Sequence, residues 1–257
     1  MRETDSIFDL TGRTALITGG GTGLGKHFAE VLSGAGAVVI LCARRVEKLQ
    51  QTVDEIRASG GKAHCYVMDV TDEASIAEAF DHAAVHGLVD ILVNNAGTMA
   101  QPSLLALDEA TWDSVQATNL KGAWMVAKEA VKRLEGKEAA GTVINIASIL
   151  GMAVQKGTGP YSASKAALLH LTKNMAVEWA RYGVRVNAIA PGYYATDLAE
   201  EFLDSSQGQA MLRGIPQRRL GNVEDLSGPI LLLSSQASAY MTGTCITVDG
   251  GHSVSTI

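Results

Sequence analysis

The stretch T-A-L-I-T-G-G-G-T-G-L-G-K-H-F-A-E-V-L, residues 14–32, decides how this chain folds. It opens with the apolar run 14–17, typical of a buried strand, and closes with 26–32, where apolar residues recur at helical spacing. Five glycines lie between them, at residues 19–25. Bare glycine backbone lets amide groups approach a phosphate, and the N-terminus of a helix favours negative charge. The stretch therefore predicts a phosphate-binding turn, although Leu24 breaks the G-x-G-x-x-G pattern and no G-K-S/T follows.

Strand-like and helix-like segments alternate along the rest of the chain. This alternation predicts an α/β fold: a doubly wound, Rossmann-like parallel sheet of about seven strands, with helices on both faces. Ligands bind beyond the carboxyl ends of such strands. No repeat or linker divides the sequence, so we expect a single dinucleotide-binding and catalytic domain over residues 1–257. The expected strands lie near 14–18, 37–42, 63–67, 89–93, 142–147, 184–189 and 244–248, and the expected helices near 24–34, 45–59, 73–86, 109–134, 160–181, 197–213 and 223–234.

The composition favours a single globular domain and argues against nucleic-acid-binding and membrane proteins. A chain of 257 residues that is 47% apolar can bury one large core. A net charge of −6 and an aromatic content of 5% argue against a nucleic-acid surface. Its longest apolar runs are too short to cross a bilayer, and the N-terminus lacks an apolar signal core.

Cysteine and histidine spacing argues against a metal site. Cys42, Cys65 and Cys245 are widely separated and lie in strand-like runs, so we expect buried free thiols in a reducing compartment such as the cytoplasm. His82 and His86 are four residues apart with no acidic residue between them, which indicates a solvated helix face.

Tyr161 and Lys165 lie four residues apart in Y-S-A-S-K, within a helix-like segment. Residues at this spacing share a helix face, so the ammonium can lie beside the phenol. A nearby positive charge favours the phenolate and lowers the tyrosine pKa. The pair therefore predicts a tyrosine that gives or takes a proton near neutral pH.

Six features together resemble the short-chain dehydrogenase/reductase family in their order and spacing. The resemblance extends from Leu10 to the V-D-G-G segment at 248–251. The features are T-G-x-x-x-G-x-G at 18–25, N-N-A-G at 94–97, Asn119, Ser148, Y-x-x-x-K at 161–165 and P-G at 191–192.

The resemblance implies an oxidoreductase that transfers a hydride between a nicotinamide cofactor and a ketone or secondary alcohol. In this interpretation Tyr161 is the general acid and base, and Ser148 donates a hydrogen bond to the substrate oxygen. Lys165 tunes the tyrosine and holds the ribose, and Asn119 helps to hold a water between Lys165 and solvent. Some relatives are non-catalytic dinucleotide sensors, but these typically lose the tyrosine or lysine that this chain retains.

The end of the second expected strand favours NADPH over NAD. NAD-dependent proteins place an acidic residue there to bind the ribose hydroxyls. This chain has Cys42-Ala43-Arg44-Arg45 instead, and a guanidinium offers forked donors to a 2′-phosphate. We therefore expect Arg44 to bind that phosphate, with Arg45 secondary.

Asp69 and Val70 form the pair that contacts adenine in the family, and Asp72 is the better helix cap, which leaves Asp69 free. The resemblance assigns the remaining cofactor contacts to Gly19, Gly21, Thr22, Gly23, Leu24, Gly25, Asn95, Ala96, Gly97, Pro191, Gly192 and Thr196, together with Tyr161 and Lys165.

Residues 193–214 follow the sixth expected strand and predict a substrate lid. Its apolar residues predict an apolar pocket for a ketone of modest size. The lid sequence is also similar to that of gluconate 5-dehydrogenase-type members, which act on sugar acids, and reductases of 3-oxoacyl thioesters share the catalytic motifs. The apolar residues are Leu198, Phe202, Leu203, Met211 and Leu212, with Leu150, Met152 and Val154 opposite.

Two helix-like segments, 115–134 and 163–179, are apolar nearly all round. Such a helix is buried on both sides, so one side would cover the sheet and the other would meet a second subunit. Because the family often forms tetramers in this way, we expect a homotetramer that binds a small carbonyl substrate and neither nucleic acid nor membrane.

Overall fold

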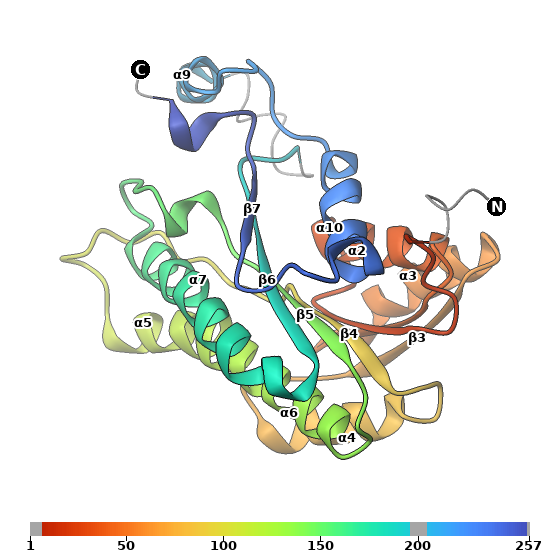
Figure 1. Cartoon of the computed structure of the whole chain (residues 1–257). Helices are drawn as coiled ribbons and strands as arrows, with labels where there is room; N and C mark the ends of the chain where they lie inside the picture. Colours follow the sequence, from red (N-terminus) through yellow and green to blue (C-terminus); the bar gives the residue numbers. More distant parts are fainter. Residues whose placement is uncertain (1–6, 196–204, 256–257) are drawn as a thin grey trace.

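The computed structural model describes residues 7–195 and 205–255, and its centre is a seven-stranded parallel sheet (Figure 1). The strand order is β3-β2-β1-β4-β5-β6-β7, and every neighbouring pair is parallel. This confirms the doubly wound fold. The strands are β1 (Thr14–Thr18), β2 (Val38–Ala43), β3 (Lys62–Val67), β4 (Val89–Asn94), β5 (Gly141–Ile146), β6 (Val184–Pro191) and β7 (Cys245–Val248).

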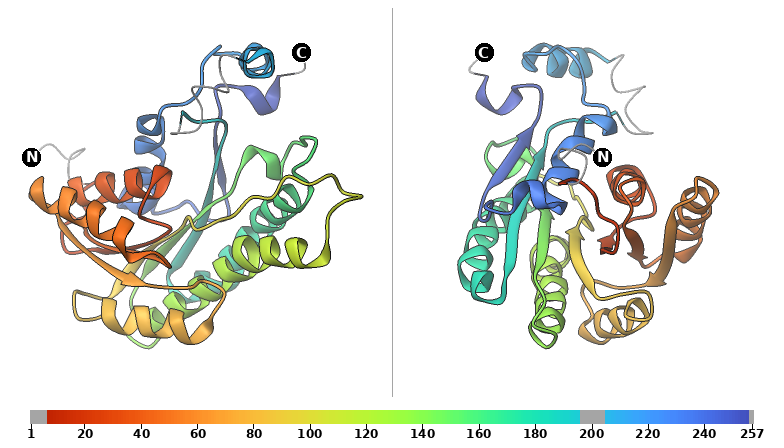
Figure 2. Two further views of the ribbon diagram at one scale, coloured as in Figure 1. Left: turned by 180° about the vertical axis from the view of Figure 1, so that it is seen from behind. Right: turned by 45° about the vertical axis from the view of Figure 1, so that its right-hand side comes forward.

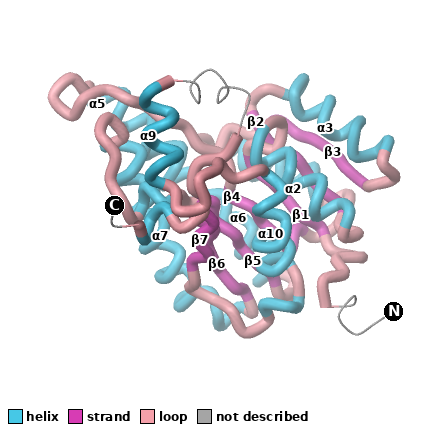
Figure 3. Tube along the Cα trace, turned by 90° about the horizontal axis from the view of Figure 1, so that it is seen from above, coloured by secondary structure: helices cyan, strands magenta, loops and turns pink. Residues whose placement is uncertain are grey.

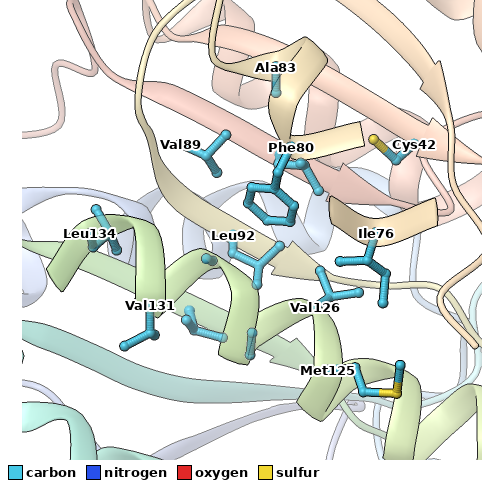
Figure 4. Packing of buried hydrophobic residues seen from close by; sticks show 14 of the residues in the cluster. Cys42, Ile76, Phe80, Ala83, Val89, Leu92, Met125, Val126, Val131 and Leu134 are labelled. Atoms are coloured by element: carbon cyan, nitrogen blue, oxygen red, sulfur yellow. The ribbon is translucent and has the colours of Figure 1, made fainter. Parts of the chain in front are cut away.

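Helices cover both faces of the sheet, as Figure 2 shows. On one face lie α2 (Gly23–Gly34), α3 (Val46–Ala58) and α10 (Ser227–Ser234), and on the other lie α4 (Glu73–Ala83), α6 (Ala123–Glu135) and α7 (Gly159–Trp179). The strands are buried on both sides because their side chains alternate between the two layers. In β1, Leu16 packs with α4 and α6, whereas Ile17 packs with α2 and α10. Figure 4 shows the layer between the sheet and the helices α4 and α6, where Phe80 of α4 lies against Leu92 of β4.

The helix expected over 109–134 is divided into three consecutive helical segments. It consists of α5 (Glu109–Gln116), a π-helical turn (Ala117–Gly122) and α6. A π turn widens the helix by one residue and occurs often at functional sites, and periodicity does not reveal it. The other helices were predicted to within a few residues, and the segment expected near 197–213 is described only as α9 (Ser206–Gly214).

Helix caps follow the expected chemistry. The Asp72 carboxylate accepts a hydrogen bond from the Ala74 amide at 3.0 Å, which confirms it as the cap of α4. Asp108 caps α5 in the same way through the Thr111 amide at 2.7 Å.

The prediction that two helices are apolar nearly all round is wrong for α6, whose outer face carries Lys128 and Lys132 and has Trp124 as its one large exposed apolar side chain. On α7 the outer face is mixed, because His170, Lys173 and Glu178 are exposed and so is Val177. Most of the apolar side chains of both helices pack within this chain, so the helices alone do not require a second subunit.

The cysteine and histidine predictions need smaller corrections. All three cysteines are free, but only Cys42 is buried, and Cys65 and Cys245 are half-buried. His82 and His86 do not form a purely solvated face. His86 stacks on His64 of β3 at 3.5 Å between ring centroids, and His82 stacks on Tyr66 at 5.1 Å. No cluster of three potential metal ligands occurs in the described residues. Within the same ranges, none of the helices has the length and apolar character needed to span a membrane.

Candidate active site

The glycine turn lies where β1 meets α2, at the carboxyl edge of the sheet. Seen from the side of α9, loops occupy the space between that helix and α2 (Figure 3). Gly19 and Gly23 have φ values of +69° and +54°, which glycine adopts without strain. A Cβ on Gly25 would collide with the carbonyl oxygen of Gly19, so the turn tolerates no side chain there. The loop is thus built for close approach of its backbone to a ligand.

A cavity of about 520 Å³ opens over this turn. Most residues predicted to bind the cofactor line it, whereas Gly23, Tyr161, Lys165, Pro191 and Gly192 do not, and Thr196 lies outside the described residues. The predicted set did not include six further lining residues, Cys42, Ala43, Lys48, Met68, Thr98 and Thr118. The predicted residues that line the cavity are Gly19, Gly21, Thr22, Leu24, Gly25, Arg44, Arg45, Asp69, Val70, Asn95, Ala96 and Gly97.

Gly192 has a packing role. Its amide donates to the carbonyl of Val248 at 2.9 Å, and a Cβ there would lie 2.7 Å from the Cβ of Asp249. The glycine therefore permits the close approach of the chain after β6 to the end of β7.

Asn95 fastens the end of β4 to the glycine turn. Its Nδ2 donates to the carbonyls of Thr18 at 3.0 Å and Gly19 at 3.1 Å, and the Thr18 hydroxyl accepts from the amides of Asn95 and Ala96. These bonds use the Asn95 side chain within the protein, so it shapes the cavity.

Three cations gather at the end of the cavity next to β2. Arg44 and Arg45 follow β2, and Lys48 lies in the first turn of α3. Neither arginine has a hydrogen bond or ion pair among the described residues, and an exposed, unpaired cation cluster at the rim suits a phosphate. A cavity of this size with a glycine cradle and free cations fits a phosphorylated dinucleotide.

Asp69 is less free than the sequence suggested. Its carboxylate accepts from the amide and hydroxyl of Thr71 at 2.9 and 2.7 Å. These bonds, followed by the nearby Arg44 charge, hold the pKa of Asp69 below its usual value against the opposing effect of burial. The carboxylate is therefore ionised at neutral pH and fixed at the cavity wall.

Lys165 lies almost fully buried beside Tyr161. Its Nζ is 5.6 Å from the centroid of the tyrosine ring and donates to the carbonyl of Ile146 at the end of β5, at 2.7 Å. Burial disfavours the ammonium and lowers the pKa of Lys165 from 10.5 to about 8. The pairing expected from the i, i+4 spacing is present.

The tyrosine pKa differs from expectation in direction. Burial raises the pKa of Tyr161, a hydrogen bond with Ser148 opposes that rise, and the neighbouring Tyr193 adds to it. Desolvation outweighs the favourable contacts because the phenolate loses more hydration than one hydroxyl returns.

Ser148 lies two residues after β5 in an extended conformation and is buried. Its oxygen accepts from the amide of Leu150 at 3.1 Å. That bond orients the hydroxyl and leaves its proton available to donate.

Asn119 sits in the π turn and is fully engaged. Its Oδ1 accepts from the Thr98 amide at 2.8 Å, while Nδ2 donates to the Thr98 carbonyl at 2.9 Å and to Ser164 at 3.0 Å. A Cβ on Gly97 would lie 3.4 Å from Asn119 Oδ1 and 3.7 Å from Lys165 Nζ. The site thus brings together the end of β4, the π turn and α7.

A second cavity, of about 360 Å³, lies beside Ser148, since Ile149 and Leu150 line it. It corrects the prediction of an apolar pocket, because Gln155, Tyr193 and His252 line it together with apolar residues. Of the predicted apolar set, Leu150, Val154 and Met211 line this cavity, Met152 and Leu212 do not, and Leu198, Phe202 and Leu203 lie outside the described residues.

Comparisons with known proteins agree with this geometry. A family model described as enoyl-(acyl carrier protein) reductase matches residues 19–253. The chain is 36% identical to gluconate 5-dehydrogenase of Gluconobacter oxydans, covering 97% of this chain and 98% of that protein. It is 37% identical to the 3-oxoacyl-(acyl-carrier-protein) reductase of Thermotoga maritima, covering 94% and 98%. The crystal structure of a gluconate 5-dehydrogenase from Burkholderia cenocepacia, in complex with NADP and tartrate, is similar with a TM-score of 0.92 and 35% identity, covering 98% and 99%.

Proposed function

The chain belongs to the short-chain dehydrogenase/reductase family, and from that premise we propose that Tyr161, Ser148 and Lys165 carry its chemistry. The protein is an NADP-dependent oxidoreductase that interconverts a ketone and a secondary alcohol. One observation carries the residue assignment: the Nζ of the buried Lys165 lies 5.6 Å from the ring centroid of the half-buried Tyr161. Gly97 of the first cavity lies near this Nζ, and Tyr193 of the second cavity lies near the tyrosine.

The cofactor, when bound, supplies the hydride that reduces the carbonyl carbon. The glycine turn would hold its phosphates, Arg44 the 2′-phosphate and Asp69 the adenine. Lys165 would hold the ribose, beside the backbone of Asn95 to Gly97.

Charge flow during reduction assigns the other roles. Negative charge builds on the substrate oxygen as the carbon is reduced. The Ser148 hydroxyl donates a hydrogen bond to that oxygen, and the Tyr161 hydroxyl gives it a proton. In the oxidative direction the tyrosine takes the proton back. Asn119 acts as a positioning residue, because its side chain bonds only to Thr98 and Ser164 among the described residues.

Replacing Tyr161 by Phe tests this mechanism. The substitution keeps the ring and removes the proton, so ketone reduction falls by roughly two to four orders of magnitude while NADPH binding survives. Tyr240→Phe is the matched control, since Tyr240 is fully exposed. A folded Tyr161→Phe protein that binds NADPH and reduces its ketone at the wild-type rate would refute the assignment.

The substrate is a small molecule, and we propose a hydroxylated one such as a sugar acid, the class named for several relatives. The polar residues of the second cavity support this choice. A 3-oxoacyl thioester is the second candidate, favoured by the apolar wall that Ile149, Leu150 and Val154 form there. NADPH oxidation measured with ketones, keto-sugar acids and 3-oxoacyl thioesters separates the two.

We further propose that residues 1–257 form one dinucleotide-binding and catalytic domain with a substrate lid around 193–214, of which 193–195 and 205–214 are described. We propose the cytoplasm as the compartment because three unpaired thiols suit a reducing environment. A homotetramer is also proposed, on the family resemblance and the exposed Trp112 and Trp124.

A further inference from the structure

The second cavity opens directly beside the proposed reaction centre. Ile149 and Leu150, which follow Ser148 in the chain, line it. Tyr193 lines it as well and is close enough to Tyr161 to raise the pKa of that phenol. A substrate whose carbonyl met Ser148 and Tyr161 would therefore extend its chain into this space.

The lining of the cavity is chemically mixed. Its apolar side chains include Ile149, Leu150 and Val154 from the segment after β5 and Met211 from α9. Its polar side chains include Gln155, Tyr193, His252 and Ser253. A carbon chain that carries hydroxyl groups offers both C–H groups and oxygens to such a lining.

Two of these polar side chains have hydrogen-bonding atoms without a partner among the described residues. The Tyr193 hydroxyl donates to Gln155 Oε1 at 2.9 Å, which orients the amide, and the Gln155 NH2 group has no partner among the described residues. The imidazole of His252 packs against Tyr193 at 5.4 Å between ring centroids. Neither of its ring nitrogens has a hydrogen bond within the described ranges, and only Nδ1 is buried, so Nε2 remains accessible.

We infer that His252 and Gln155 form a subsite that binds a hydroxyl group on the substrate chain. A hydroxyl donates and accepts, so it can accept from the Gln155 amide and pair with His252 Nε2 in either tautomer. A carboxylate only accepts and brings a charge, and no lysine or arginine lines the described part of this cavity. A methyl group would leave both polar groups unpaired. The inference rests on the proposed function, since it assumes that the carbonyl binds at Ser148 and Tyr161.

Three five-carbon methyl ketones test the subsite: 5-hydroxy-2-pentanone, 4-oxopentanoate and 2-pentanone. They differ at the far end, which is a hydroxymethyl, a carboxylate or a methyl group. We expect kcat/KM with NADPH to be highest for the hydroxyl compound, by about five- to tenfold over 2-pentanone. His252→Phe keeps a ring against Tyr193 but removes both nitrogens. It should bring this ratio to about one, mainly by raising KM for the hydroxyl compound. His170→Phe, on the outer face of α7, is the control and should keep it.

The same ketones, measured as ligands by thermal shift with NADP+ bound, give a readout that needs no turnover. The hydroxyl compound should stabilise the wild type more than the other two, and His252→Phe should lose the difference. Equal or better binding of the carboxylate or methyl compound, by rate and by shift, would overturn the subsite. Binding preference without reduction of any ketone would instead refute the proposed function and leave the subsite standing.

Discussion

We expect cofactor choice to depend most directly on Arg44. It follows β2 at the cavity rim, is exposed, and has no hydrogen bond or ion pair among the described residues. Arg44→Asp removes the 2′-phosphate partner and puts an acid near the ribose. We expect kcat/KM for NADPH to fall by about two orders of magnitude, as for the loss of a charged contact, while NADH holds or gains.

Arg45→Ala is the comparison for that experiment, and its effect should be smaller. Unchanged NADPH kinetics in Arg44→Asp would show that this arginine is only a surface residue.

The buried Lys165 ammonium should lower the free energy of unfolding at neutral pH. Its pKa falls from 10.5 to about 8 in the folded chain because it is buried. Between these values the unfolded chain binds a proton that the folded chain does not, so the free energy of unfolding rises with pH across that window. Below pH 8 the full penalty applies, about 3 kcal/mol on this scale.

Lys165→Met should therefore unfold at a higher temperature than wild type at pH 7, although activity falls. We expect a net gain of about 2 kcal/mol, because the lost hydrogen bond to Ile146 offsets about 1 kcal/mol. The gain should shrink as pH approaches 10. Lys173→Met, on the exposed side of α7, is the control; a Lys165→Met protein no more stable than this control at pH 7 would contradict the prediction.

At the scale of elements, the π turn before α6 contacts both α7 and the wall of the first cavity. Asn119 of this turn holds Thr98 and Ser164, and Gly122 at its end lies against the chain after β3. A Cβ on Gly122 would lie 2.9 Å from both the Cγ2 and the carbonyl oxygen of Val70, which lines the cofactor cavity.

Gly122→Ala should push these two segments apart. We expect a loss of stability of about 1–3 kcal/mol, as for overpacking, together with a higher Kd for NADPH by calorimetry. Gly228→Ala in α10 is the matched control, because nothing lies within 4 Å of its Cβ position. It should stabilise the protein by up to about 1 kcal/mol. Equal effects of the two substitutions would rule out the proposed contact.

For the whole molecule, the proposed homotetramer predicts an interface between subunits. Leu171 and Trp179 pack partly against this chain's own core, so substitutions there would test folding more than association. Trp124 is a cleaner probe, since it is exposed on α6 with Lys128 over its ring at 5.3 Å. If α6 forms part of a subunit interface, Trp124→Glu should shift the sedimentation coefficient toward the monomer without lowering the melting temperature of the monomer. A wild type that sediments as a monomer at every concentration would defeat the tetramer.

The amino-acid sequence predicts the parallel sheet, the helices that cover it and most of the residues that line the first cavity. These features depend on local signals: the glycine turn at 19–25, alternation of strands and helices, and the arginines after β2. Each of these signals extends over a few residues, so it can be recognised without knowing which distant segments pack against it. The order of the motifs along the chain also singles out Ser148, Tyr161 and Lys165.

The charge states and the substrate side of the site follow from long-range contacts in the folded chain. The pKa of Tyr161 is raised because burial, which depends on everything packed around α7, outweighs its local contacts. The π turn at Asn119 is set by contacts with Thr98 and Ser164, which are 21 and 45 residues away in sequence. His252 reaches Tyr193 across 59 positions, and no pattern along the chain marks that meeting. Long-range packing brings these groups together, and a pattern of residue types along the chain does not show which distant segments will meet.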